Sequence, residues 1–206
     1  MSDSLIRPYR PADRAAVADI CIRTGDGGVD ATPVYPDPQI LPAIFALPYV
    51  ELEPDLAFVV DHEGTVAGYV LGAADTATFA RRFAAEWLPT VADRYPLPVG
   101  PPSTPAERMA LLLHHPERMV RPELADYPAH LHIDLLPGHQ GAGYGRKLIT
   151  ALFAALHAKG VARVHLEMAT SNTGARAFYD RVGFHELWRS PAPGTTVLGR
   201  STAPTP

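Results

Sequence analysis

The sequence predicts an α/β fold, in which helices lie on both sides of a mixed central sheet. Two observations support this prediction, the first for the fold class and the second for a globular chain. Segments whose apolar residues alternate at period two, as in strands, are interleaved with segments whose apolar residues recur at helical spacing. The chain also has 206 residues, 47% of them hydrophobic and 19% charged, a balance typical of a globular protein rather than a disordered one. We therefore expect a single domain over residues 1–206.

The first half of the chain is predicted to start with a strand and a helix and to continue into a hairpin. Pro8 restricts the first strand to a sheet edge, and Val17, Ile20 and Cys21 recur at helical spacing. A turn at Gly64 separates two apolar runs, which is typical of a hairpin. The expected elements are a strand at 4–10, a helix at 12–23, a loop at 24–36, a broken helical stretch at 37–51 and paired strands at 57–60 and 66–71.

The middle of the chain differs in character from both flanks. Two helical patterns, at about 76–93 and 104–118, lie on either side of a proline cluster at 96–102. Such a cluster could be a linker between two domains. We favour a helical, proline-rich insertion over about 76–128, because the flanking parts look like two halves of one sheet.

The second half is predicted to alternate strands and helices. Apolar and polar residues alternate along 129–136, as in a strand. Gly160 and Gly183 follow two helical patterns and act as stop signals. The expected elements are strands at 129–136 and 163–168, helices at 143–159 and 172–182, and final strands at 184–189 and 195–199.

Charge and residue usage exclude several classes of function. The formal net charge is −4, which disfavours a nucleic-acid partner. No apolar run is long enough to cross a membrane, and the first residues lack the apolar core of a signal peptide. We therefore expect a cytoplasmic protein with no membrane partner. The single cysteine, Cys21, excludes an internal disulfide. His130 and His132 share a strand face with Asp134, but no further ligand stands at a convincing spacing, so we expect no metal.

The segment that carries most chemical information is the glycine-rich turn at 139–146, between a strand and a helix. Such a turn exposes backbone N–H groups and the N-terminus of a helix, and glycines let a phosphate approach the backbone closely. A pyrophosphate is therefore the expected ligand. The spacing of Gly141, Gly143 and Gly145 matches neither the dinucleotide fingerprint nor the phosphate loop of nucleotide hydrolases. A plain glycine-rich connection is the alternative.

A second motif, at 172–184, makes the pattern specific. Together the two segments resemble the GNAT superfamily of N-acetyltransferases, over roughly residues 129–186. The loop motif of that family, Q/R-x-x-G-x-G/A, is matched by Gln140, Gly143 and Gly145. Its helix motif, N-x-x-A-x-x-F/L-Y-x-x-x-G-F, is matched by Asn172, Ala175, Phe178, Tyr179, Gly183 and Phe184. The resemblance implies a mostly antiparallel mixed sheet with one splayed pair of parallel strands.

Outside these motifs, the chain is similar to the acetyltransferase-like domains of eukaryotic O-GlcNAcases. This likeness includes the runs 68–72 and 197–201 and the residues Trp87 and Pro89, and it implies that the insertion is shared. The eukaryotic domains have a degenerate cofactor loop, whereas this chain retains the full loop.

The family resemblance implies that acetyl-CoA is the co-substrate and that it lies between the strands at 129–136 and 163–168. The backbone at Leu135 and Leu136 would contact the acetyl group or the pantetheine arm. The pyrophosphate would bind the backbone of Gln140, Gly141, Ala142, Gly143, Tyr144, Gly145 and Arg146. The later helix would contribute Asn172, Ala175, Phe178 and Tyr179, although an asparagine at 172 is also an ordinary helix cap.

Three residues are candidates for the chemistry. Tyr179 would protonate the departing thiolate of CoA, because a phenol can donate as charge develops on sulfur; a tyrosine packed in the core is the alternative. Glu167 and Asp134 are the candidate general bases, and either could instead be a structural carboxylate. The resemblance implies a direct attack of the amine, without a covalent enzyme intermediate.

The predicted function is therefore acetyl-CoA-dependent N-acetylation of a primary amine, carried by a small molecule or a protein. The main alternative is a module that binds acetyl-CoA without transferring it and acts as an interaction or sensing domain. A transferase for hydroxyl acceptors or longer acyl chains is a third possibility. Both a monomer and a homodimer are compatible with the sequence.

Overall fold

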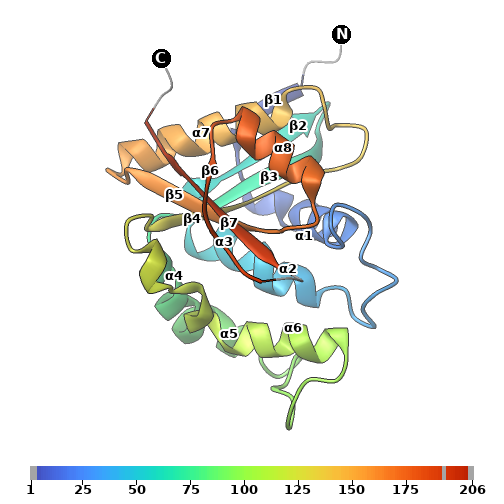
Figure 1. Cartoon of the computed structure of the whole chain (residues 1–206). Helices are drawn as coiled ribbons and strands as arrows, with labels where there is room; N and C mark the ends of the chain where they lie inside the picture. Colours follow the sequence, from blue (N-terminus) through green and yellow to red (C-terminus); the bar gives the residue numbers. More distant parts are fainter. Residues whose placement is uncertain (1–3, 192–193, 204–206) are drawn as a thin grey trace.

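The computed structural model describes residues 4–191 and 194–203, and its centre is a seven-stranded mixed sheet (Figure 1). Within these described residues, five of the six pairings between neighbouring strands are antiparallel, and only β4 and β5 run parallel. Across the sheet the order is β1 (Ser4–Pro8), β2 (Ala57–His62), β3 (Thr65–Ala73), β4 (Ala129–Leu135), β5 (Arg163–Ala169), β7 (Thr195–Ser201) and β6 (His185–Arg189). The predicted fold class is confirmed.

The parallel pair in the middle of the sheet opens like a V. Strands β4 and β5 pair only at Ala129↔Val164 and His130↔His165. Beyond that point β4 stays paired with β3 as far as Leu135, and β5 stays paired with β7 over its whole length. Each strand is held by its outer neighbour, so a gap remains between the later residues of β4 and β5.

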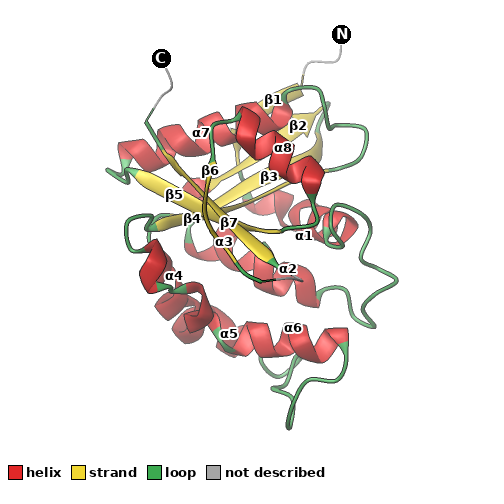
Figure 2. Cartoon of the chain, viewed as in Figure 1, coloured by secondary structure: helices red, strands yellow, loops and turns green. Residues whose placement is uncertain are grey.

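Helices cover both faces of the sheet (Figure 2). On one face, α7 (Tyr144–Ala158) packs Leu148, Leu152 and Leu156 into a core with β-strand residues, and α8 (Thr173–Arg181) adds Tyr179. The opposite face carries α1 (Arg14–Thr24), α2 (Ile40–Phe45) and α3 (Leu47–Leu52). Short 3-10 helices at Pro11–Asp13 and Pro54–Leu56 precede α1 and β2.

The segment between β3 and β4 forms a helical layer on the α1–α3 face, seen below the sheet in Figure 1. It contains α4 (Thr76–Arg82), a π turn (Phe83–Trp87), α5 (Leu88–Val91), α6 (Pro105–His114) and 3-10 helices at Pro116–Met119 and Pro122–Leu124. The Trp87 indole N–H donates to the Ala43 carbonyl of α2 at 2.8 Å. The apolar side chains of this helical layer belong to the same core cluster as those of α1–α3 and β3.

The element boundaries differ from the sequence predictions where prolines and caps intervene. The second helix of the insertion ends at His114 instead of 118, because Pro116 cannot continue it. Its start is fixed by Thr104, whose hydroxyl accepts from the Glu107 amide while the Glu107 carboxylate accepts from the Thr104 amide. Within the described residues, no helix is long and apolar enough to cross a membrane.

Candidate functional site

A pocket of about 570 Å³ opens along the last residues of β4, beyond the point at which β4 stops pairing with β5. Its walls come from four parts of the chain that are far apart in sequence. They are the end of α1 and the loop after it, the last residues of β4, the loop leading into α7, and α8. All predicted cofactor residues line this pocket except Leu136, Ala142 and Tyr144.

The loop leading into α7 presents free backbone amides to the pocket. Gly141 and Gly143 have φ values of 76° and 83°, which favour glycine. Gly143 is the N-cap of α7, and no side chain caps this helix, so its first-turn amides are available to an anion. No backbone carbonyl of the described residues accepts a hydrogen bond from the amides of 140–143.

Two side-chain contacts fix this loop in place. The Gln140 amide donates to the Leu135 carbonyl at 3.0 Å, which ties the loop to the end of β4. At Gly145 an added Cβ would lie 2.9 Å from the Phe178 ring, so only glycine lets α7 approach α8 this closely. The matched motif residues Gln140 and Gly145 therefore act as structural supports of the loop.

The backbone of β4 directs free polar groups into the gap. The Leu136 amide donates to the Ala67 carbonyl of β3 at 3.0 Å. In an antiparallel ladder alternate residues face the same neighbour, so Leu135 and Ile133 turn their N–H groups towards the gap. Leu135 and Leu136 were both expected to present backbone groups to the cofactor, and their amides face opposite sides of β4. The Leu136 amide is already bonded within the sheet.

Helix α8 brings Tyr179 to the inner wall of the pocket. Its side chain is only 9% exposed and its ring packs against Phe178 and Phe184. Burial, and secondarily the carboxylate of Asp134, raise the pKa of Tyr179 above its usual value. The phenol therefore stays protonated and can donate. Asn172 caps α8, its side chain accepting from the Ala175 amide at 3.0 Å, and it also lines the pocket.

Asp134 lies on the β4 wall of the same pocket. It stands opposite Tyr69 of β3, whose hydroxyl donates to its carboxylate at 2.6 Å. Burial raises the pKa of Asp134 to about 6, although the hydrogen bond from Tyr69 acts in the opposite direction. A carboxylate that titrates near neutrality suits a general base.

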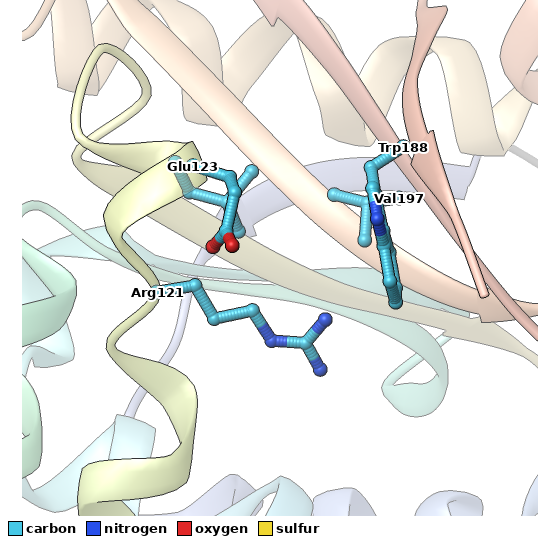
Figure 3. A pocket seen from close by; sticks show the side chains of 5 residues that line it. Arg121, Glu123, Trp188 and Val197 are labelled. Atoms are coloured by element: carbon cyan, nitrogen blue, oxygen red, sulfur yellow. The ribbon is translucent and has the colours of Figure 1, made fainter.

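Glu167 does not line this pocket. It stands on β5, partly exposed, and its carboxylate pairs with the Arg121 guanidinium at 2.9 Å. Beside this pair is a smaller pocket of about 90 Å³, between the insertion and strands β6 and β7. Figure 3 shows the Arg121 side chain extending from the insertion towards Trp188 and Val197. Its guanidinium lies 5.3 Å from the centre of the Trp188 ring.

Several residues near the gap gave no functional signal in the sequence. Thr24, Gly27, Gly28 and Val29 line the main pocket, but the glycine-rich stretch after α1 indicated only a loop. Tyr69, whose hydroxyl donates to Asp134, lies on a strand whose sequence indicated only one half of a hairpin. These contributions depend on which elements become neighbours in the fold, and no local sequence pattern indicates them.

Comparisons with known proteins identify the family of this chain. Residues 110–184 match the Acetyltransferase (GNAT) family. The chain is 59% identical to the protein in the crystal structure of SsHAT, which superposes with a TM-score of 0.95 and covers 98% of this chain and 100% of that one.

Two further comparisons concern proteins of lower sequence identity. Protein O-GlcNAcase of Rattus norvegicus is 27% identical over 200 residues, which are 95% of this chain. The match spans 22% of that protein, so this chain corresponds to about one fifth of it. The structure of yncA, a putative acetyltransferase from Salmonella typhimurium with its cofactor acetyl-CoA, shares the fold with a TM-score of 0.57 at 17% identity. Its alignment covers 97% of this chain and 94% of that one.

Proposed function

Because the chain belongs to the GNAT family of acetyltransferases, we propose that it transfers the acetyl group of acetyl-CoA directly to a primary amine. The single observation that carries this proposal is the pocket beside the last residues of β4. One wall presents free amides for a pyrophosphate, while Asp134 and Tyr179 stand on two other walls. An acid and a base on opposite sides of a strand gap suit acyl transfer between a thioester and an amine.

The residues of the pocket fit the parts of acetyl-CoA. The loop amides and the N-terminus of α7 would hold the pyrophosphate, with Arg146 beside them. The pantetheine arm would run along the free edge of β4 towards Ile133. The Leu135 N–H would point at the thioester oxygen and stabilise the negative charge that develops there.

The two titratable residues have complementary roles in this proposal. Asp134 takes the proton that the amine loses on attack, because its raised pKa makes it a better base than an ordinary aspartate. Tyr179 gives its proton to the sulfur as the carbon–sulfur bond breaks. The phenolate that remains is reprotonated from solvent after CoA departs. Glu167, which lies outside the residues that line this pocket, remains the second candidate base.

The experiment that tests the function is turnover of acetyl-CoA with a panel of amines, measured as released thiol. The panel holds a peptide with a free α-amino group, a lysine peptide with a blocked N-terminus, spermidine and glucosamine. An α-amino group, with a pKa of about 7.7, loses its proton at lower cost than lysine, with a pKa of about 10.4. Thiol release above the amine-free rate supports transfer. Tight acetyl-CoA binding without release would instead indicate a binding module.

Replacing Tyr179→Phe is expected to lower kcat by about 100-fold, because general acid catalysis typically contributes that much or more. Acetyl-CoA affinity should change little, since the ring that packs against Phe178 and Phe184 remains. Tyr127→Phe is the matched control, because its hydroxyl lies near His185 and outside the pocket. An unchanged kcat in Tyr179→Phe would remove the acid role and leave a packing role.

A further inference from the structure

A chain of hydrogen bonds connects the insertion to the β4 wall of the gap. The Tyr49 hydroxyl of α3 lies 2.8 Å from Nε2 of His130 and 3.0 Å from Nε2 of His132. On its other side, Nδ1 of His130 lies 2.8 Å from the hydroxyl of Thr76, which lies 2.7 Å from the Pro128 carbonyl. Both histidines are on β4, on the strand face that carries Asp134.

The direction of each hydrogen bond in this series follows from the Pro128 carbonyl at one end and from the protonation state of His130. The Pro128 carbonyl can only accept, so the single Thr76 proton points at it and the Thr76 oxygen accepts from Nδ1 of His130. Burial lowers the pKa of His130 well below its usual value, so its Nε2 carries no proton and accepts from Tyr49. The Tyr49 oxygen must then accept from Nε2 of His132.

This order fixes the tautomer of His132 and leaves a lone pair on its Nδ1. Burial and the neighbouring Arg118 lower the pKa of His132 to about 4, so the ring is neutral near pH 7. Among the described residues none bonds to this Nδ1, and none of their buried side-chain nitrogens or oxygens lacks a partner. The Nδ1 atom must therefore reach accessible space.

His132 itself is not among the residues that line the 570 Å³ pocket, but the pocket begins at the next residue of β4, Ile133. His132 stands two residues beyond the last pair between β4 and β5. It is also two residues before Asp134, on the same strand face. His132 and the pocket-lining Asp134 are therefore successive side chains on one face of β4.

We propose that Nδ1 of His132 accepts a hydrogen bond from the attacking amine and holds it in line with the thioester carbonyl. This inference rests on the proposed function. An attacking primary amine has two N–H bonds, so one can bond to His132 while Asp134 takes the other proton. The insertion sets the orientation of the ring, because Thr76 and the Pro128 carbonyl fix the far end of the chain.

The test uses two CoA conjugates that carry an acceptor analogue and differ in one group. In S-carboxymethyl-CoA N-ethylamide an N–H occupies the place of the attacking nitrogen, and in the corresponding ethyl ester an oxygen replaces it. Calorimetric titration of the wild type should show the amide binding about 5- to 10-fold more tightly than the ester, the value of one neutral hydrogen bond. Equal affinities would overturn the proposal.

Two variants of His132 separate positioning from structure. His132→Gln places its amide N–H near the former Nε2 and keeps the bond to Tyr49, but loses the Nδ1 lone pair. His132→Asn places its oxygen near the former Nδ1 and loses the bond to Tyr49. We expect His132→Gln to abolish the preference for the amide and His132→Asn to retain part of it. The opposite order would show that the histidine only supports the fold.

Acetyl-CoA itself serves as the third ligand in each titration. Its affinity should be equal in wild type, His132→Gln and His132→Asn, because the ring lies outside the residues that line the cofactor pocket. Failure of the wild type to bind acetyl-CoA would contradict the proposed function. Normal acetyl-CoA binding without a preference between the conjugates would contradict the role of His132 alone.

Discussion

Replacing Gly143→Val is expected to weaken acetyl-CoA binding by at least about 100-fold, because several charge-assisted bonds to the pyrophosphate are lost together. Gly143 is the N-cap of α7 and has a φ of 83°. A β-branched residue strongly disfavours this conformation, so the loop must change shape. The amides at the start of α7 would then no longer converge on one anion. Calorimetric titration with acetyl-CoA measures the loss.

Gly160→Val is the matched control for this prediction. Gly160 follows α7 at its other end, with a φ of 76°, and no heavy atom outside its immediate neighbours lies within 4 Å of an added Cβ at either glycine. Both variants therefore carry similar backbone strain, of about 1–2 kcal/mol. Only Gly143 lines the pocket. Loss of affinity in both variants would point to general destabilisation, and retention in Gly143→Val would exclude the loop as the phosphate site.

The fold was largely predictable because its elements are punctuated by local signals. The hairpin at Gly64, the stop at Gly160 and the loop glycines at 141 and 143 are all needed at positive φ, and such positions leave a mark in the sequence. Prolines marked the insertion in the same way. Local chemistry was sufficient to place these boundaries.

The site was only partly predictable, because its chemistry depends on which strand faces meet. Asp134 and Glu167 looked equivalent in sequence, since both stand on strands that border the gap. In the structure Asp134 is desolvated beside Tyr69, whereas Glu167 is neutralised by Arg121 of the insertion. The contact between Arg121 and Glu167 spans 46 residues, and no local pattern encodes such a pairing. The orientation of His132 by Tyr49 and Thr76 is hidden for the same reason.

Replacing Asp134→Asn is expected to lower kcat by about 100- to 1000-fold, the usual contribution of a general base. In the wild type, kcat at saturating amine should rise with pH through about 6, as Asp134 loses its proton. This limb should be absent from the residual activity of Asp134→Asn. Glu167→Gln tests the other carboxylate. If the limb disappears in Glu167→Gln and persists in Asp134→Asn, then Glu167 is the base.

The same substitution should stabilise the protein, which separates its effect from simple unfolding. The folded pKa of Asp134, about 6, lies above the ordinary value of 3.8. The folded state therefore binds more protons than the unfolded state between these values, and stability falls as the pH rises through that window. Above pH 6 the wild type carries this cost in full, whereas asparagine is uncharged and can still accept from Tyr69.

We therefore expect Asp134→Asn to gain about 1–2 kcal/mol in the free energy of unfolding at pH 7. The gain is smaller than the full pKa shift would give, because the side chain is half-buried and solvent in the pocket screens its charge. The gain should vanish near pH 4, where both proteins are neutral at this position. Denaturant unfolding at the two pH values measures the difference. A variant that is less stable at pH 7 would show that the pocket stabilises the charge of Asp134, and the carboxylate would then be an ordinary weak base. A gain in stability together with a loss of turnover would show that the charged form of Asp134 lowers the stability of the fold but is needed for the reaction.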